Sequence, residues 1–181
     1  MFIDPTSIDG LYTIDPERHQ DDRGYFARTW CVNEFSDEGL AAGFVQGSIS
    51  FNSKANTLRG MHFQTEPYSE TKLIRCEAGA IYDVILDIRP DSDTYLQWEA
   101  FELTPENGHQ LYVAAGLAHG FLTLADNTVV GYQIDTFYQP GHAGGVRWDD
   151  PAFGIEWPDV DGAADRIMSD KDRGWPDYGP V

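Results

Sequence analysis

The residues best suited to chemistry gather in one short stretch, Leu58 to Gln64, which reads Leu-Arg-Gly-Met-His-Phe-Gln. It places Arg59, Gly60 and His62 close together in an apolar segment. An imidazole can remove a proton from a substrate when other groups orient it, return a proton and hold negative charge. Groups of these types follow later in the chain: Lys72, His119, Tyr132 and Asp172. The stretch therefore indicates acid–base chemistry, and the remaining elements must position it.

The chain has five histidines as possible proton carriers. Three of them, His19, His109 and His142, lie in polar, turn-like segments and are predicted to be surface residues. His62 and His119 instead lie between apolar neighbours, where a polar ring needs a hydrogen-bond partner. These two histidines are the candidates for a site.

Residues 115–119, Ala-Gly-Leu-Ala-His, resemble the second half-motif of the cupin barrels, which often hold iron or manganese. A metal-binding cupin normally supplies a His-x-His pair and a later Glu from its first half-motif, whereas this chain offers His62-Phe63-Gln64. Two imidazoles without a carboxylate at the right spacing are too few ligands for a catalytic metal. We therefore expect neither a metal nor another cofactor.

Other reaction classes have no motif in the chain. There is no Gly-x-Ser-x-Gly sequence, no Cys beside a suitably placed His, no glycine-rich phosphate loop and no dinucleotide fingerprint. Cys31 and Cys76 form neither a disulfide framework nor a zinc motif, so we interpret them as small buried residues in a reducing compartment. Metal-free acid–base chemistry remains.

The formal net charge of −18 argues against nucleic acids and anionic membranes as partners, because both are bound through basic surfaces. If the ligand is itself anionic, the few Lys and Arg residues must be concentrated where it binds. The alternative is that the acidity serves only solubility. No run of about 18 apolar residues could span a bilayer, and the acidic N-terminal segment does not resemble a signal peptide. We predict a cytoplasmic protein.

The sequence predicts one mostly β domain, residues 1–181, with a polar tail from about residue 158. Strands are expected at 11–14, 44–51, 57–64, 71–77, 80–89, 97–103, 110–113, 120–125 and 128–137. Short strands separated by Gly, Pro, Asn and Asp favour an antiparallel sandwich or barrel, and a jelly roll is the simplest choice. We also expect a turn at 21–24 before an aromatic strand, a short helix within 34–43 and a helical turn at 165–169.

The strand at 80–89 shows the clearest alternation. One face carries Tyr82, Val84, Leu86 and Ile88, and the other carries Ile81, Asp83, Ile85, Asp87 and Arg89. Because successive side chains of a strand point to opposite faces, we expect the first face to pack in a core and the second to be mixed.

Five segments, in order and at fitting spacing, resemble the dTDP-4-dehydrorhamnose 3,5-epimerase family: residues 58–64, 72–76, 83–89, 116–121 and 148–158. The resemblance implies an all-β, cupin-type jelly-roll barrel or sandwich with a few short helices. It also implies a homodimer that exchanges an N-terminal strand. The implied reaction is epimerisation at C3 and C5 of a nucleotide-linked 4-keto-6-deoxyhexose.

The resemblance also implies roles for individual residues. His62 would be the base, with Asp172 or its competitor Asp170 holding the tautomer, while Tyr132 would return a proton and Lys72 would face O4. From the residues alone, Tyr132 could equally be plain core, and Lys171 could form a salt bridge rather than touch ligand. The implied substrate-binding residues are Arg23, Phe26, Arg28, Gln46, Ser48, Arg59, His119 and Lys171, with the diphosphate held by Arg59 and by Arg23 from the partner subunit.

One spacing needs an irregular strand. Arg59 and His62 are three residues apart, so a regular strand would point them to opposite faces. Gly60 predicts a bulge that brings both side chains inward. Without that bulge, one of the two assignments fails.

Departures from the family pattern gather at the nucleotide end of the pocket. Arg28 stands where the family usually has Glu, Gln46-Gly47-Ser48 replaces Gln-Asp-Asn, and Ala143 replaces a Glu. Our hypothesis is that the reaction class is kept while the nucleotide or the sugar differs from the thymidine-linked one. The alternatives are inversion of a single carbon, a metal-dependent cupin such as a dioxygenase, and a non-catalytic module that binds a sugar nucleotide.

Overall fold

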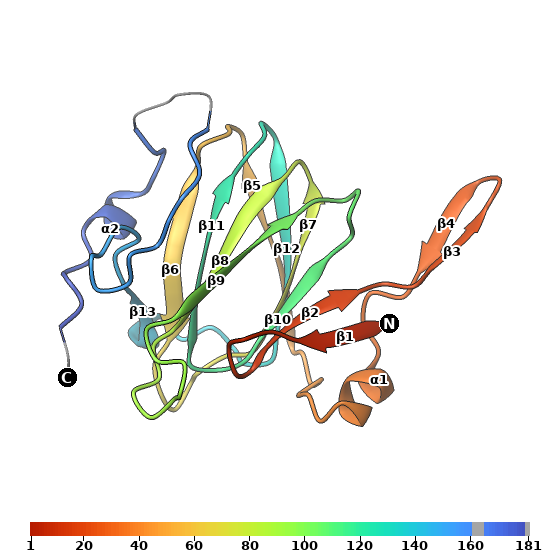
Figure 1. Ribbon diagram of the computed structural model, residues 1–181, viewed down its shortest axis with the longest axis horizontal. Helices are drawn as coiled ribbons and strands as arrows, with labels where there is room; N and C mark the ends of the chain where they lie inside the picture. Colours follow the sequence, from red (N-terminus) through yellow and green to blue (C-terminus); the bar gives the residue numbers. More distant parts are fainter. Residues whose placement is uncertain (161–164, 180–181) are drawn as a thin grey trace.

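Two antiparallel sheets make up the body of the protein in the computed structural model, which describes residues 1–160 and 165–179 (Figure 1). The six-stranded sheet has the order β1-β2-β10-β7-β12-β5, and the five-stranded sheet has the order β13-β6-β11-β8-β9. A separate hairpin, β3–β4, projects away from both sheets. The prediction of an all-β fold is confirmed.

The strands of the body follow the predicted pattern closely. They are β5 (Gln46–Asn52), β6 (Leu58–Gln64), β7 (Lys72–Ala78), β8 (Ile81–Asp87), β9 (Trp98–Leu103), β10 (Gln110–Val113), β11 (Leu117–Thr123) and β12 (Thr128–Ile134). The chain crosses between the sheets after β5, β6, β7, β9, β10, β11 and β12. Residues of β6 and β11 in one sheet therefore face residues of β7 and β12 in the other.

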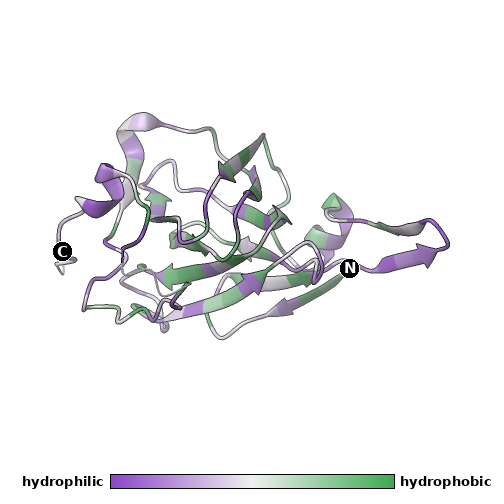
Figure 2. Cartoon of the chain, turned by 90° about the horizontal axis from the view of Figure 1, so that it is seen from above, coloured by the Kyte–Doolittle hydropathy of each residue, from purple (hydrophilic) through white to green (hydrophobic). Residues whose placement is uncertain are grey.

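The N-terminal part holds β1 (Phe2–Pro5), β2 (Leu11–Asp15), β3 (Arg18–Asp21), β4 (Gly24–Ala27) and the helix α1 (Val32–Asp37). The C-terminal part holds the 3-10 turn η1 (Pro140–His142), β13 (Ala143–Gly145) and the helix α2 (Asp170–Arg173). The strand β3 is exposed and hydrophilic along its whole length, whereas apolar residues concentrate along the strands of the two sheets (Figure 2).

The main core lies between the two sheets. Strands of both sheets contribute buried apolar side chains to it, among them Ile74, Ile81, Ile85, Leu111, Phe121 and Val130. Burying such side chains stabilises the fold by about 1.5–3 kcal/mol each. Tyr132 packs against the same cluster and is not itself fully buried.

Both faces of β8 are covered: one packs in a core and the other is mixed, as expected, and the mixed face is buried as well. Val84 and Leu86 pack on the outer side with Phe153, while Trp157 and Tyr178 add partly buried aromatic area. The mixed face turns toward the space between the sheets, where Ile81 and Ile85 join the main core. The carboxyl group of Asp83 therefore enters the interior of the barrel.

Three smaller predictions need correction. The helix α1 begins and ends earlier than the predicted 34–43, and the helical turn expected at 165–169 lies at Asp170–Arg173, where Ser169 caps its N-terminus. Cys31 is half-buried rather than buried, whereas Cys76 is buried and its burial raises the pKa of the thiol to about 11. The predicted tail includes residues 161–164 and 180–181, which lie outside the described residues.

Candidate active site

A bulge in β6 sets the direction of the side chains around His62. His119 pairs with His62 and Phe121 pairs with Arg59, so two residues of β6 stand opposite the single residue Gly120 of β11. Gly60 has a φ of 131°, and a Cβ there would lie 2.5 Å from the Cα of Gly120. Only glycine fits this conformation and this close approach. The bulge expected at Gly60 is confirmed.

The bulge directs Arg59 toward the six-stranded sheet. Its Nε donates a hydrogen bond of 2.7 Å to Oδ1 of Asn52 on β5. Burial raises the pKa of the Tyr132 phenol on β12, and the positive charge of Arg59 lowers that pKa by a smaller amount. Arg59 is therefore an exposed cation on the side of β6 that faces β5.

His62 is hydrogen-bonded to a buried carboxylate. Its Nε2 lies 2.6 Å from Oδ1 of Asp172, whose side chain is 6% exposed, while the imidazole is 41% exposed. Burial alone raises the pKa of Asp172, but hydrogen bonds from His62, Ser169 and the backbone of Gly60 hold it below its usual value. An ionised carboxylate only accepts hydrogen bonds, so Nε2 carries the hydrogen. The lone pair of Nδ1 remains free to take a proton.

Asp172, rather than its competitor Asp170, is the residue that contacts His62. Asp172 lies in the four-residue helix α2 and its backbone N–H donates to Oγ of Ser169 at 3.1 Å. Asp170, at the start of the same helix, is exposed.

Lys72 extends into the barrel from β7 and is 6% exposed. Its ammonium lies 2.9 Å from Oε1 of Glu70 and 3.5 Å from the backbone carbonyl oxygen of His62. Oε2 of Glu70 accepts a further hydrogen bond of 2.9 Å from Gln64. Sequence reasoning missed Glu70, because it lies in a polar loop just before β7 and only the fold brings it against Lys72.

A second histidine–carboxylate pair lies deeper in the barrel. Nε2 of His119 is hydrogen-bonded to Oδ1 of Asp83, and both side chains are buried. Within residues 1–160 and 165–179, Oδ2 of Asp83 has no hydrogen-bond partner. The sequence pattern did not identify Asp83, because an isolated Asp on a mixed face is usually a surface residue.

Tyr132 packs edge-on against His119, with ring centroids 5.9 Å apart. Burial is the main cause that raises the pKa of Tyr132 well above its usual value, and the negative charge of Asp83 raises it further. The hydroxyl is therefore protonated at neutral pH. It can serve as a proton donor.

Two other predicted residues lie next to this group by strand register. Ser48 of β5 pairs with Tyr132, and Gln46 pairs with Ile134, which in turn pairs with Lys72. Oε1 of Gln46 also accepts a hydrogen bond of 2.8 Å from the backbone of Tyr138, whose exposed ring sequence reasoning missed.

Lys171 precedes Asp172 in α2, and its ammonium lies 5.4 Å from the ring centroid of Trp175. A cation over an aromatic face is stabilised electrostatically. This contact differs from both predicted uses of Lys171, a salt bridge or a ligand contact, and it leaves the ammonium exposed to solvent.

A family model described as dTDP-4-dehydrorhamnose 3,5-epimerase matches residues 5–179. The dTDP-4-dehydrorhamnose 3,5-epimerase of Sinorhizobium fredii is 41% identical over 97% of this chain and 89% of its own length. The chain belongs to the dTDP-4-dehydrorhamnose 3,5-epimerase family. It is therefore an isomerase, and the predicted family resemblance is confirmed.

Solved structures of the epimerase family share the fold. The Bacillus anthracis enzyme, crystallised with TDP and PPi, superimposes with a TM-score of 0.92 at 40% identity, covering 98% of this chain and 99% of its own. A 3'-monoepimerase from Streptomyces bikiniensis, in complex with dTDP-quinovose, superimposes with a TM-score of 0.88 at 30% identity, covering 96% and 86%. The prediction of a cupin-type jelly roll is confirmed by these likenesses.

Three predicted site residues of this epimerase lie away from His62 in the same chain. Arg23 is at the tip of the β3–β4 hairpin, where it pairs with Asp21, and Phe26 is 73% exposed on β4. The hairpin projects from the end of the molecule opposite to β6 and α2 (Figure 1). Arg28 pairs with Glu34 of α1 at 2.6 Å. Arg23 and Phe26 cannot complete the site of their own subunit.

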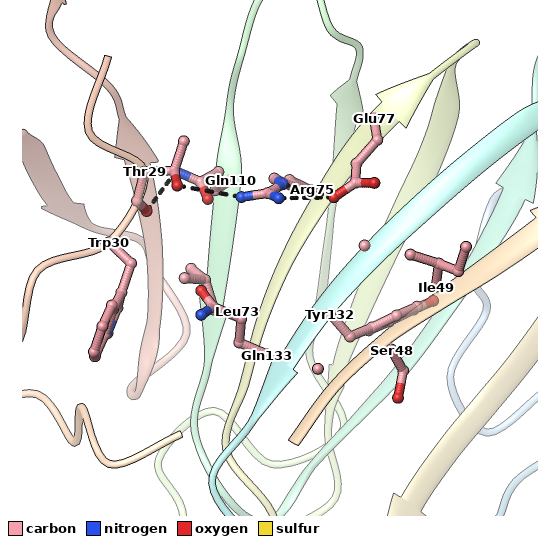
Figure 3. Close-up of a pocket in the computed structure, with 12 residues that line it drawn as sticks. Thr29, Trp30, Ser48, Ile49, Leu73, Arg75, Glu77, Gln110, Tyr132 and Gln133 are labelled. Atoms are coloured by element: carbon pink, nitrogen blue, oxygen red, sulfur yellow. Dashed lines mark hydrogen bonds and ion pairs between the residues drawn. The ribbon is translucent and has the colours of Figure 1, made fainter. Parts of the chain in front are cut away.

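A cavity of about 570 Å³ does not have His62 in its lining. It opens on the face of β7 that carries Leu73, Arg75 and Glu77 (Figure 3). Lys72 is the neighbour of Leu73 in this strand, and its side chain therefore points to the opposite face. Thr29 and Trp30, from the segment between β4 and α1, form its other side. Ser48 and Tyr132 also line this cavity, whereas His62, Lys72 and Asp172 do not.

No group of three or more His, Cys, Asp or Glu side chains within the described residues is arranged to hold a metal ion. The same part of the chain contains no helix with the length and apolar character needed to cross a membrane.

Proposed function

We propose that this chain inverts C3 and C5 of a thymidine-diphosphate-linked 4-keto-6-deoxyhexose, because the names of its relatives favour this nucleotide over the different one hypothesised from the sequence. The observation that carries the proposal is the pair formed by His62 and Asp172, which engages Nε2 of a half-exposed imidazole and leaves Nδ1 to take a proton. The buried ammonium of Lys72 lies 3.5 Å from the backbone carbonyl oxygen of the same histidine. The family and the names of its members support the reaction class. The cytoplasm remains our predicted location.

The C4 ketone of such a sugar makes the hydrogens on C3 and C5 acidic. His62 takes one of these hydrogens as a proton at Nδ1, and Asp172 stabilises the imidazolium that forms. The electron pair of the broken C–H bond moves to O4, where Lys72 stabilises the enolate. Tyr132 then returns a proton to the same carbon from the opposite face. Each inversion is redox-neutral and needs no co-reactant.

The nucleotide end supports a diphosphate ligand. Arg59 supplies a fixed cation, held by Asn52, in an otherwise strongly acidic chain. The exposed ring of Tyr138 lies beside Gln46 and can stack on a base.

Two of the departures from the family pattern have partners within the chain. Arg28 forms an ion pair with Glu34, and Ala143 lies in β13 opposite Gln64. Initial rates with thymidine-, cytidine- and guanosine-diphosphate 4-keto sugars test the nucleotide.

The direct test is proton NMR of dTDP-4-keto-6-deoxyglucose in deuterium oxide. We expect wild type to introduce deuterium at C3 and C5 and His62→Ala to introduce none. His109→Ala is the matched control, because His109 is an exposed histidine paired with Asp15, and we expect it to behave as wild type. Failure of wild type on all three nucleotide sugars would favour the binding-module alternative.

A second candidate, inversion of one carbon only, is supported by the likeness to the 3'-monoepimerase of Streptomyces bikiniensis. The same spectra separate the two candidates. Deuterium at C3 alone, with C5 retaining its hydrogen after prolonged incubation, would establish the single-carbon reaction.

We also propose that the active form is a homodimer in which the hairpin of one subunit completes the site of the other. Arg23 and Phe26 lie on a projecting, exposed hairpin, and the edge strand β5 exposes Ile49 by 70% and Phe51 by 56%. Covering such apolar area favours association. Light scattering should give twice the chain mass. A mixture of Arg23→Ala and His62→Ala subunits should regain activity that neither variant has alone.

A further inference from the structure

The carboxylate of Asp172 reaches His62 from a short element. The helix α2 has four residues, and isolated helices of that length are not stable in water. The position of Asp172 must therefore come from contacts between the tail and the barrel. Figure 1 shows α2 lying beside β6.

The tail is tied to the start of β6 by a parallel bridge between Thr57 and Ile167. The backbone N–H of Leu58 donates to the carbonyl oxygen of Ile167 at 2.9 Å, and the N–H of Ile167 donates to that of Asn56 at 2.9 Å. His62 lies five residues after Thr57, and Asp172 lies five residues after Ile167. The two segments thus run from a common bridge to the point where their side chains meet.

The side chain of Asn56 fixes this bridge. Asn56 is 6% exposed, and both ends of its amide are used. Nδ2 donates to the carbonyl oxygen of Asp165 at 2.9 Å, and Oδ1 accepts from Nη1 of Arg166. Nη2 of Arg166 donates to the carbonyl oxygen of Pro158 at 2.7 Å, and Nη2 of Arg173 donates to that of Arg166. The network holds the chain on both sides of Ile167.

The backbone conformation at residue 56 does not by itself require an asparagine side chain. Its φ of 61° is the left-handed region, which asparagine tolerates and glycine adopts without strain. A glycine would satisfy the turn and would lose both amide hydrogen bonds. The substitution Asn56→Gly therefore removes the clamp and keeps the backbone conformation.

We infer that Asn56, together with Arg166, is a positioning residue for proton abstraction. It touches neither substrate nor His62, and it acts by holding α2 where Asp172 meets Nε2 of the imidazole. The inference rests on the proposed epimerase function, which assigns His62 as the base. The competing explanation is that the network only adds stability to the tail.

The first test measures deuterium incorporation by Asn56→Gly and by Arg166→Met. We expect each to lower the rate about tenfold or more, because a small displacement of an orienting group is costly to catalysis. In an Asp172→Asn background, the same substitutions should lower the rate no further, because their effect passes through that carboxylate. Equal losses in both backgrounds would overturn the inference.

The second test needs no substrate and so separates this inference from the proposed function. Long-range proton–nitrogen NMR reports which ring nitrogen of each histidine carries the hydrogen. In wild type we expect the hydrogen of His62 on Nε2, and in Asn56→Gly and Arg166→Met a mixture of tautomers. His119, which is bonded to Asp83 of β8 and not to the tail, is the internal control and should keep its spectrum.

The remaining outcomes are also decisive. If His62 keeps its hydrogen on Nε2 in both variants, the clamp does not position the pair and the inference is wrong. Asp87→Asn weakens the hydrogen bonds that Asp87 accepts from Arg89, Ser92 and Thr94 in a different loop. It should leave the spectrum of His62 unchanged, and a change in that spectrum would favour the explanation by general stability. If Asn56→Gly does not fold, Arg166→Met carries the test. If wild type exchanges no nucleotide sugar, the proposed function fails and the NMR result still decides the positioning role.

Discussion

Asp87 gives a stability prediction whose size follows from its surroundings. The carboxylate is fully buried at the end of β8 and accepts hydrogen bonds from Arg89, Ser92 and Thr94. Burial raises the pKa of Asp87, but the hydrogen bonds dominate and lower it from 3.8 to about 2. This difference corresponds to about 2.4 kcal/mol of stabilisation by the ionised form. Asp87→Asn should lower the free energy of unfolding by about 2 kcal/mol at pH 7.

The pH dependence identifies the cause. Because the pKa of Asp87 is lower in the folded than in the unfolded chain, its stabilisation is complete above 3.8 and is lost as the pH falls towards about 2. Urea unfolding at one protein concentration, followed by tryptophan fluorescence from pH 7 to pH 2.5, should show the difference between wild type and Asp87→Asn shrinking only below about pH 4. Asp91→Asn, an exposed carboxylate of the same loop, is the control. A difference that does not vary with pH, or that equals the control, would refute the reasoning.

Three further predictions concern the site. Gly60→Ala should destabilise the protein by roughly 1–3 kcal/mol more than Gly24→Ala, as measured by thermal unfolding. Both glycines have a φ near 131°, but only a Cβ at Gly60 would collide with another backbone segment. Tyr132→Phe should still introduce deuterium through His62 but release little inverted sugar, and rapid inversion would remove Tyr132 as the acid. Lys72→Met should lower kcat by about 10²–10³, whereas Lys54→Met, at an exposed ion pair, should match wild type.

The sequence predicted most of the fold because strand patterns are local. Period-2 alternation and breaker residues located the eight strands β5 to β12, and the spacing of Arg59 and His62 around Gly60 predicted the bulge. These signals depend on neighbouring residues in the chain. Elements that depend on distant contacts were placed less well, as with the helical turn expected at 165–169, since α2 is held by β6 rather than by its own propensity.

The partners of the predicted site residues also depend on distant contacts and could not be predicted from the sequence. Glu70 and Asp83 form ion pairs with Lys72 and His119, yet neither has a local pattern that marks it. Their roles arise when β7 faces β6 and when β8 pairs with β11. A buried cation or imidazole nevertheless needs a partner, so the sequence could have indicated that carboxylates must lie near Lys72 and His119 without indicating which ones.

Two similar histidine–carboxylate pairs in one barrel are expected to have different uses because they are buried to different degrees. The imidazole of His62 is 41% exposed and can reach a sugar, while its partner Asp172 is shielded and remains available to accept its hydrogen. The imidazole of His119 is 6% exposed and its partner Asp83 is completely buried. A group that exchanges protons with substrate must be reached by substrate. His62 therefore fits the role of base, and His119 with Asp83 forms a polar wall against which Tyr132 is packed.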